Sequence, residues 1–322
     1  MKLRLRTSAK DEKPEYKRRS ASQWAVAWRR FKRNKPGVIG LIIVLVVVFF
    51  GIFGDLLAPY PAKPNPGYDA PFYKGDVRVP PSSEYPLGTS AGGTDILSDM
   101  LHATKYALYV GVVVTAITMA ISIVVGAVAG YFGGWVDNVL MRITEIFLVF
   151  PVFLFILVFV RIFTLTNTAT TFEIPGIGGI PIGLTIVILV LAIFNWAGNA
   201  RMVRGEFLRV RELEFVEAEK ALGASSKRII FRHVLPNILS SIIVVSTLTI
   251  AYAILMEAAV SFLGFGDPNT LTWGQILQEN FEYMQTVWWA EVFPGIAILI
   301  TVFGFNLLGD GLSDALNPRL RD

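Results

Sequence analysis

Six runs of mainly apolar residues divide this chain, and each approaches the roughly 20 residues that a helix needs to cross a lipid bilayer. Only 17% of the residues are charged, whereas soluble domains usually carry about 25%. These features favour a membrane protein over a soluble enzyme or binding domain. The sequence therefore predicts an all-α, polytopic membrane protein with six spans, at residues 38–57, 106–131, 139–162, 181–196, 238–263 and 292–308.

Lysine and arginine are distributed unevenly along the chain. Residues 1–35 hold thirteen of them and the segment 197–237 between the fourth and fifth spans holds eight, whereas the loop between the fifth and sixth spans holds none. Because basic loops tend to stay in the cytoplasm, both termini and the 197–237 segment are predicted to be cytoplasmic. An even number of spans requires the same arrangement. We therefore expect a multi-pass protein of the cell membrane.

The residues before the first span form a basic arm. Trp24, Trp28 and Phe31 recur at helical spacing among arginines and lysines, a pattern typical of a helix that lies in the membrane interface. The charge adjoins a span, so membrane lipid is the expected partner and nucleic acid is not. The predicted order of parts is a basic cytoplasmic arm at 1–37, a span at 38–57, an extracytoplasmic loop at 58–105 and a core of five spans at 106–322.

Several residues inside the predicted spans are unusual for a membrane interior. Gly126, Gly130 and Gly134 recur every fourth residue, which predicts close packing against another helix. Pro151 predicts a kink in the third span. Glu257 lies inside the fifth span, where an ionisable group is a functional candidate by default. We interpret it either as a hydrogen-bonding group between helices or as a residue that lines a transport pathway.

The residue types present argue against catalysis and against metal or ATP binding by this chain. Cysteine is absent and there are two histidines, which leaves no thiol nucleophile and no Cys- or His-rich metal cluster. No Gly-x-x-x-x-Gly-Lys-Ser/Thr sequence occurs, so no ATP-binding P-loop is expected. An intramembrane enzyme would need paired catalytic groups at depth, and a channel would need a carbonyl filter or a charged ring; neither pattern is visible. The chain is expected to bind no cofactor or metal and to be no enzyme by itself.

The segment 197–237 contains a charged helix–turn–helix pattern. A first helix is predicted over residues 206–222, Gly223 follows it as a C′ glycine can, and Ser225 is placed to cap a second helix. Small residues at the turn would let a partner backbone approach, and the charges around them would supply polar contacts. The pattern is read either as a docking site for a soluble partner or as a linker on lipid headgroups. The candidate docking residues are Glu217, Ala218, Lys220, Ala221, Leu222, Gly223, Ala224 and Arg228.

The order of residues in this segment resembles the EAA loop of ABC importer permeases. Glu217-Ala218 is followed by Gly223 and, after nine more residues, by a stretch that ends in Leu235-Pro236. From about residue 25 to the end, further strings resemble one branch, the dipeptide/oligopeptide permeases of the C type. They are Pro86-Leu87-Gly88-Thr89 with Asp95-Ile96-Leu97-Ser98, Gly133-Gly134-Trp135-Val136-Asp137 with Leu140-Met141-Arg142, Ser261-Phe262-Leu263-Gly264-Phe265-Gly266, Trp273-Gly274, Phe293-Pro294-Gly295, Asn306-Leu307-Leu308-Gly309-Asp310-Gly311-Leu312 and Asn317-Pro318-Arg319-Leu320.

The resemblance implies a subunit with the type I permease fold that forms half of a translocation pathway. A homologous permease would pair with it, and two ATP-binding subunits would use ATP and Mg²⁺. An extracytoplasmic solute-binding protein would deliver a peptide. In this family the loop docks into a cleft on the ATP-binding subunit, which favours docking over a lipid-surface linker. Transport of oligosaccharides or nickel is the alternative among relatives, and a channel or membrane scaffold outside the family is the remote one.

A few positions depart from the family pattern. Glu219 stands where the loop usually has its second alanine, and His233 stands where the general pattern has an isoleucine. Near the second span, Tyr85, Ser90 and Thr94 replace the more usual histidine, aspartate and arginine. These departures bear on the outer gate and the substrate class rather than on the fold.

Overall fold

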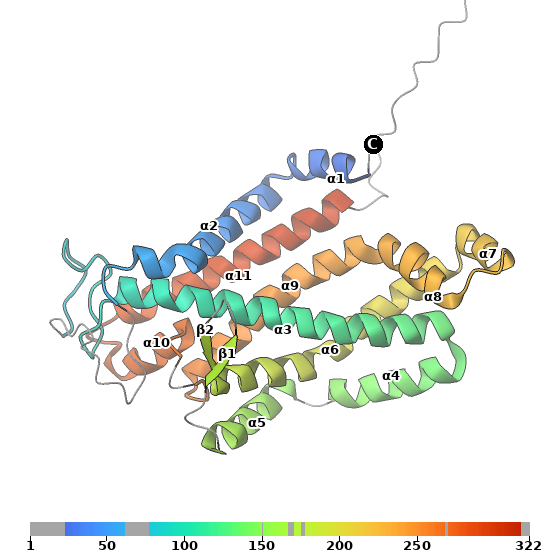
Figure 1. Ribbon diagram of the computed structural model, residues 1–322. Coiled ribbons are helices and arrows are strands. Elements are labelled where there is room, and N and C mark those ends of the chain that lie inside the picture. Colours follow the sequence, from blue (N-terminus) through green and yellow to red (C-terminus); the bar gives the residue numbers. More distant parts are fainter. Residues whose placement is uncertain are drawn as a thin grey trace, which may run out of the picture.

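The computed structural model describes residues 23–61, 77–149, 151–166, 171–174, 178–267 and 270–316. The first 22 residues of the predicted arm, residues 62–76 of the predicted loop, the Trp24 side chain and the tail after residue 316 lie outside this description. Within it the chain is a bundle of long helices (Figure 1). The helices are α1 (Gln23–Phe31), α2 (Lys35–Leu57), α3 (Ile96–Phe132), α4 (Gly134–Val149), α5 (Val152–Thr166), α6 (Ile182–Arg211), α7 (Glu214–Ala221), α8 (Ser226–Arg228), the π-helical turn η1 (Ile229–Val234), α9 (Leu235–Phe262), α10 (Trp273–Asn280), the 3₁₀ turn η2 (Phe281–Tyr283) and α11 (Trp289–Leu316).

Among the described residues, five helices are long and apolar enough to cross a membrane, namely α2, α3, α6, α9 and α11. Helices α4 and α5 pass the same test as a pair that is bent by 80°. Pro151 stands at their break, where its missing N–H and its ring prevent an unbroken helix. The predicted six spans are therefore confirmed when the bent pair counts as one, and the predicted kink at Pro151 is a full interruption.

Two spanning helices extend well past the apolar runs from which they were predicted. Helix α3 begins at Ile96 rather than at residue 106, and Asp95 caps it by accepting the backbone N–H of Ser98 (2.9 Å). Its polar first turns are buried, as the positions of Ser98 and His102 show. Helix α6 likewise continues to Arg211 instead of ending near residue 196. Hydropathy marks the apolar part of such a helix, whereas caps and neighbouring segments decide where it ends.

The predicted glycine face is a packing surface for two of its three members. Helix α3 runs along α6 (Figure 1). A Cβ at Gly126 would lie 2.7 Å from the carbonyl oxygen of Ala200, and one at Gly130 would lie 2.8 Å from that of Arg204. Gly134 instead begins α4 with a φ of +56° and has no described atom within 4 Å of its Cβ position. Small residues therefore bring α3 and α6 into backbone contact.

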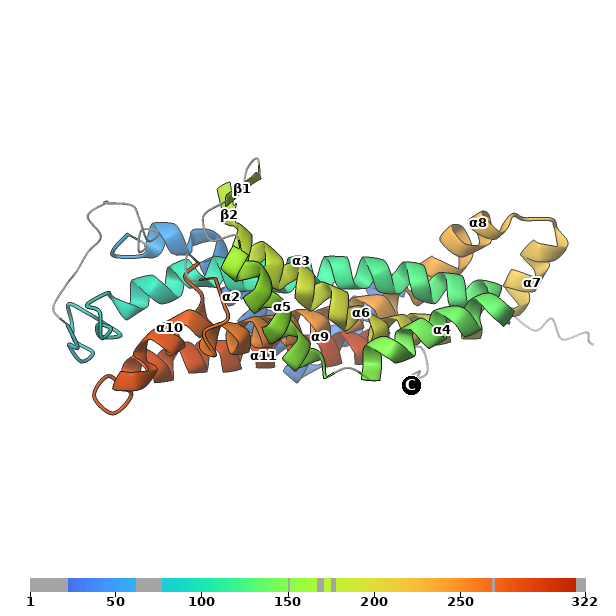
Figure 2. The ribbon, with the colours of Figure 1, turned by 90° about the horizontal axis from the view of Figure 1, so that it is seen from below.

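The two ends of the bundle are built differently (Figure 2). Helices α7 and α8 project from one end. Helix α10 and the segment before α3 lie at the other. Two short antiparallel strands, β1 (Thr171–Ile174) and β2 (Gly178–Pro181), connect α5 to α6, with Thr171 paired to Pro181. These strands are an addition to the predicted all-α fold.

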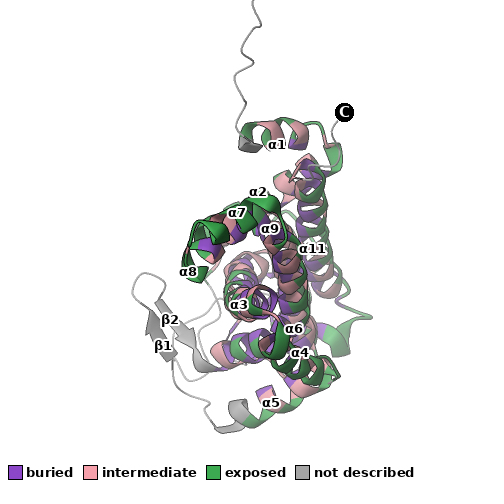
Figure 3. Cartoon of the chain, turned by 90° about the vertical axis from the view of Figure 1, so that its right-hand side faces the viewer, coloured by how far each residue is buried: buried purple, intermediate pink, exposed green. Residues whose placement is uncertain are grey.

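Helix α1 lies against the C-terminal end of α11 (Figure 3). The Phe31 side chain is 2% exposed and lies 3.1 Å from the positions that a Cβ would take at Gly37 of α2 and at Gly311 of α11. Just after α1, the Asn34 amide donates to the Asp314 carboxylate over 2.9 Å. The arm therefore contains a helix, as its residue spacing predicted, and this helix is fixed to the ends of two spanning helices. Its place in the membrane interface stays a prediction.

Candidate functional site

The segment between α6 and α9 forms a compact projection, here called the hairpin, which comprises residues 212–234 (Figures 1 and 2). The predicted single helix over 206–222 is wrong, because α6 ends at Arg211 and α7 begins at Glu214. The N–H of Leu213 bonds to the carbonyl of Val210 (3.1 Å), and this turn redirects the chain. The interruption lets Val216 face back toward α6, where it is fully buried.

The turn of the hairpin is built as predicted at Gly223 and Ser225. Gly223 has a φ of +78°. Its N–H bonds to the carbonyl of Lys220, and the N–H of Ala224 bonds to that of Glu219, each over 3.0 Å. This pair of bonds is the Schellman motif, which favours glycine at this position. The Ser225 hydroxyl then accepts the N–H of Arg228 (3.4 Å) and caps α8.

One face of the hairpin is buried against the bundle. Val216, Ile229 and Val234 are at most 1% exposed and pack in one cluster with Phe207 and Val210 of α6. The cluster continues into α3 and α9. Burial of a large aliphatic side chain contributes roughly 1.5–3 kcal/mol, so the three hairpin residues hold the projection firmly. The hairpin is a packed extension of the spanning helices rather than a loose loop.

The opposite face of the hairpin is exposed, and it carries the predicted docking residues (Figure 3). Leu222 at the tip is 83% exposed. Beside it, no described atom lies within 4 Å of the Cβ position of Gly223. Ala224 is half-buried, whereas the other candidates are exposed: Glu217, Ala218, Lys220, Ala221 and Arg228. The structure gathers these residues around one tip; their role in docking stays a prediction.

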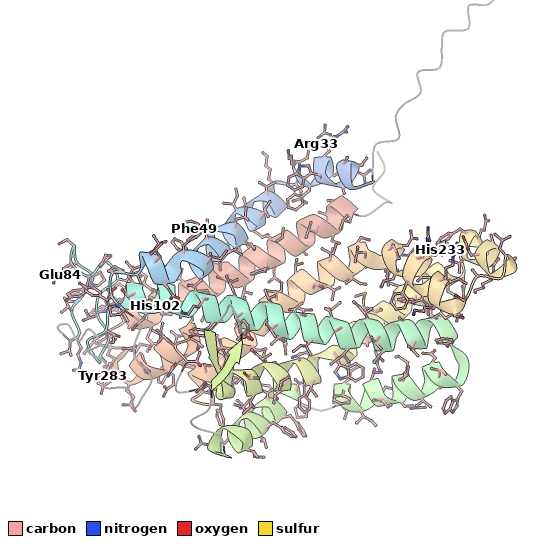
Figure 4. The ribbon with its side chains drawn as sticks, viewed as in Figure 1. Arg33, Phe49, Glu84, His102, His233 and Tyr283 are labelled. Carbon is pink, nitrogen blue, oxygen red and sulfur yellow. The ribbon has the colours of Figure 1, made fainter. Side chains whose placement is uncertain are left out.

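Glu219 and His233 come together inside the hairpin. Glu219 lies on α7 and His233 lies on η1, and Glu219 Oε1 is 3.6 Å from His233 Nε2. His233 is labelled in Figure 4. The two departures from the family pattern are therefore neighbours in space, although fourteen positions separate them in the chain. Sequence reasoning had treated them as independent.

Two arginines of α6 attach the hairpin end of that helix to α3 and α4, and sequence reasoning missed both contacts. Arg204 forms a two-pronged ion pair with Asp137 of α4. Arg211 donates to the carbonyl oxygens of Gly130 and Tyr131 at the end of α3, each over 3.1 Å. The available signal was Asp137 within a Gly-Gly-Trp-Val-Asp string and a basic segment after the fourth span, but nothing in the sequence paired them.

Glu257 is buried between α9 and α10, with 2% of its surface exposed. The Ser261 hydroxyl donates to Glu257 Oε1 over 2.6 Å, and the Thr272 hydroxyl is a second hydrogen-bonding partner. Thr272 also caps α10 by accepting the N–H of Gln275 (3.3 Å). The interpretation of Glu257 as a hydrogen-bonding group between helices agrees with these contacts, whereas its place in a transport pathway stays a prediction.

At the end opposite the hairpin, polar side chains join α2 to α3 (Figure 4). Asp55 contacts both His102 Nδ1 and Lys105 Nζ over 2.6 Å. The other ring nitrogen of His102 lies 3.0 Å from the carbonyl oxygen of Tyr60. Across the described ranges, no group of three or more His, Asp or Glu residues is arranged to hold a metal ion. This polar cluster was not predicted, because its members are far apart in the sequence.

Comparisons with known proteins match nearly the whole chain. Residues 122–322 match the family model of the binding-protein-dependent transport system inner membrane component, and residues 22–81 match that of the N-terminal TM domain of oligopeptide transport permease C. The dipeptide transport system permease protein DppC of Bacillus subtilis is 35% identical over 96% of this chain and 90% of its own length. Its counterpart in Escherichia coli K12 is 39% identical over 91% and 92%. The glutathione transport system permease protein GsiD of Escherichia coli O6:K15:H31 is 36% identical over 92% and 91%.

Proposed function

The chain belongs to the family of inner membrane components of binding-protein-dependent transport systems, and from this membership we propose that it is a permease subunit of an ATP-driven importer of short peptides. It forms half of the translocation pathway and pairs with a homologous permease. Two ATP-binding subunits bind below it and use ATP and Mg²⁺, and an extracytoplasmic solute-binding protein delivers the peptide. The similar proteins are named for dipeptide and glutathione transport, which supports peptides over oligosaccharides or nickel.

The hairpin is the observation that carries this proposal. An exposed leucine at a tip, beside a glycine with free space around it, offers a partner an apolar anchor and a close backbone approach. Binding energy in an interface concentrates in a few residues near its centre. The packed opposite face ties the tip to α3, α6 and α9, so a displacement of the tip moves spanning helices. We therefore assign docking of an ATP-binding subunit to Glu217, Ala218, Lys220, Ala221, Leu222, Gly223, Ala224 and Arg228.

The orientation follows from the same assignment. A hairpin that meets ATP-binding subunits lies in the cytoplasm, which puts α1 and the C-terminal end of α11 on that side as well. In this proposal α1 rests in the inner membrane interface, where Arg29, Lys32 and Arg33 are exposed to lipid headgroups and Phe31 anchors the helix to the bundle. The segment around residues 58–105 then faces the solute-binding protein.

The transport proposal is tested by reconstitution. The permease pair, its ATP-binding subunits and the solute-binding protein are placed in proteoliposomes, and uptake of a labelled dipeptide, maltotriose and Ni²⁺ is measured with and without ATP. We expect ATP-dependent uptake of the dipeptide alone. Uptake of the sugar or the metal instead would replace the substrate assignment. Dipeptide uptake without any ATP-binding subunit would contradict the transport mechanism itself.

The orientation is tested by thiol labelling, for which the absence of cysteine from this chain is an advantage. A Leu222→Cys variant should react with a membrane-impermeant maleimide in inverted vesicles and not in intact cells. The matched Glu84→Cys variant, at the opposite end of the bundle (Figure 4), should show the reverse pattern. Labelling of Leu222→Cys in intact cells would rule out docking of cytoplasmic subunits at the hairpin.

A further inference from the structure

The ion pair between Arg204 and Asp137 has a geometry that fixes orientation as well as distance. Arg204 Nε and Nη2 donate to separate oxygens of the Asp137 carboxylate. Such a fork sets the rotation of one side chain relative to the other, which a single contact does not do. The Asp137 side chain is 12% exposed and that of Arg204 is 32% exposed. The pair is therefore better shielded from water than an ordinary surface ion pair.

The covalent connection between α3 and α4 is, by contrast, a flexible one. Two consecutive glycines, Gly133 and Gly134, form it with φ values of +66° and +56°. Glycine enters this region at little cost but is equally free to leave it. The connection therefore does not determine the direction of α4 by itself. A contact from another helix must do so, and the fork from α6 meets Asp137, the fourth residue of α4.

The neighbouring contacts make the end of α6 one unit with the end of α3. Arg211 donates to the last carbonyls of α3 at Gly130 and Tyr131, which satisfies groups that a helix end leaves open. At Gly130 the two helices are in backbone contact, since a Cβ there would lie 2.8 Å from the carbonyl oxygen of Arg204, and 2.6 Å from Phe207 Cβ. Phe207 itself belongs to the cluster that holds the hairpin. The hairpin, the end of α6 and the end of α3 therefore pack together as one unit.

We propose that Arg204 and Asp137 are a positioning pair that passes movement of the hairpin to α4, the first half of the bent span. This inference rests on the proposed function, because it describes how force from an ATP-binding subunit reaches the pathway. When the hairpin is displaced, α6 carries Arg204 with it, and the fork makes α4 follow about the glycine connection. Without the fork, α6 and the hairpin still move, but α4 is joined to α6 by the longer ion pair between Arg201 and Glu145 (3.7 Å) and by the rings around Phe147, which fix its orientation less tightly, and it lags behind.

The test compares this pair with a matched pair on the same helix. Arg204→Lys keeps the charge but cannot form the fork, and Asp137→Asn removes the charge. Arg209, which contacts Glu206 over 2.6 Å and is 55% exposed, provides the control variant Arg209→Lys. In the reconstituted complex, dipeptide uptake and ATP hydrolysis are measured together. The ATP consumed per peptide should rise about tenfold in both variants of the fork, within the range of about 5- to 150-fold for coupling between sites, and should stay unchanged in Arg209→Lys.

A chemical cross-link between the two positions provides the second part of the test. The double variant Asp137→Cys with Arg204→Cys places the only two thiols of this subunit at the pair, because the chain has no cysteine of its own. It should hydrolyse ATP with little uptake until a short bifunctional thiol reagent joins the two residues, and the bridge should then restore uptake. A purely structural role for the ion pair would not give recovery in an already assembled complex.

The outcomes separate this inference from the proposed function. Failure of the unaltered complex to take up dipeptide would overturn the proposed function. In a complex that does transport, an unchanged ratio of ATP to peptide in Arg204→Lys would overturn the positioning role. A bridged double variant that remains inactive would also overturn it, because α4 and α6 would then have to move relative to each other. Poor assembly of Asp137→Asn leaves the lysine variant and the bridge as the deciding measurements.

Discussion

Glu219 Oε1 lies 3.6 Å from His233 Nε2, so the two positions at which the hairpin departs from the family pattern face each other. The contact joins α7 to η1 across the turn at Gly223. The distance is longer than a hydrogen bond, and an ion pair exists only when the imidazole is protonated. We interpret the two departures as one linked change. The glutamate at position 219 is expected to contact the histidine at position 233 more favourably than it would contact the isoleucine of the general pattern.

The first prediction is that these two residues are coupled. Glu219→Ala and His233→Ile should each lower the free energy of unfolding of the hairpin region by less than about 1 kcal/mol, as expected for a partly exposed pair. The double variant should lose less than the sum, which a double-mutant cycle on thermal unfolding measures. Strict additivity of the two losses would show that the departures are unrelated.

The second prediction concerns the free space around Gly223. Replacement by alanine, leucine and tryptophan forces each side chain into a left-handed backbone conformation, at a similar cost of about 1–2 kcal/mol. The chain itself offers no described atom within 4 Å of the new Cβ, so side-chain size should not alter folding further. Recovery of ATP-binding subunits with the tagged permease should nevertheless fall from alanine to tryptophan, and dipeptide uptake should fall with it.

Gly264 provides the matched control for Gly223. It has a φ of +79° and no described atom within 4 Å of its Cβ position. It also ends its helix with the same pair of bonds, from its own N–H to the carbonyl of Ser261 (3.0 Å) and from the N–H of Phe265 to that of Val260 (3.1 Å). Gly264→Ala therefore introduces the same backbone strain at the opposite end of α9. Equal loss of ATP-binding subunits from both variants would point to strain rather than docking.

The third prediction concerns the contact between α3 and α6. Gly130→Val should lower the free energy of unfolding by about 1–3 kcal/mol through overpacking, because its Cβ would lie 2.6 Å from Phe207 Cβ and 2.8 Å from the carbonyl oxygen of Arg204. Gly205→Val is the control, since no described atom of the chain lies within 4 Å of that Cβ position. Thermal unfolding of the purified permease pair makes the comparison. Equal destabilisation by both would contradict a specific α3–α6 approach.

The hairpin shows which parts of such a site can be predicted from sequence. Gly223 and Ser225 were identified because their side chains act on neighbouring backbone groups, and this chemistry is local. The end of α6 at Arg211 was missed because residues 206–222 contain no proline and no internal glycine to mark a break. The break results from tertiary packing, in which Val216 gains a place in the buried cluster. Local signals predict caps, whereas burial decides where the chain turns.

The fork between Arg204 and Asp137 shows what a single sequence cannot supply. Both residues belong to segments that were singled out, but 67 positions separate them. Their pairing depends on the close approach of α3 and α6 and on the glycine connection that returns α4 along the bundle. The glycine face was predicted from its spacing. The helix that it meets, and therefore the charges brought together beside it, required the three-dimensional structure.

The fourth prediction separates the two interpretations of Glu257. A glutamine at this position retains an oxygen that can accept the Ser261 hydroxyl, so Glu257→Gln should leave stability and uptake nearly unchanged if the side chain serves to hold α10 against α9. Glu257→Ala removes a hydrogen-bonding partner of Ser261 and Thr272 and leaves a cavity, so it should lower the free energy of unfolding by about 2–4 kcal/mol. Thermal unfolding and dipeptide uptake are measured for both variants. If the carboxyl instead lines the pathway, Glu257→Gln will fold normally yet change the rate of uptake or the preference among dipeptides of different charge.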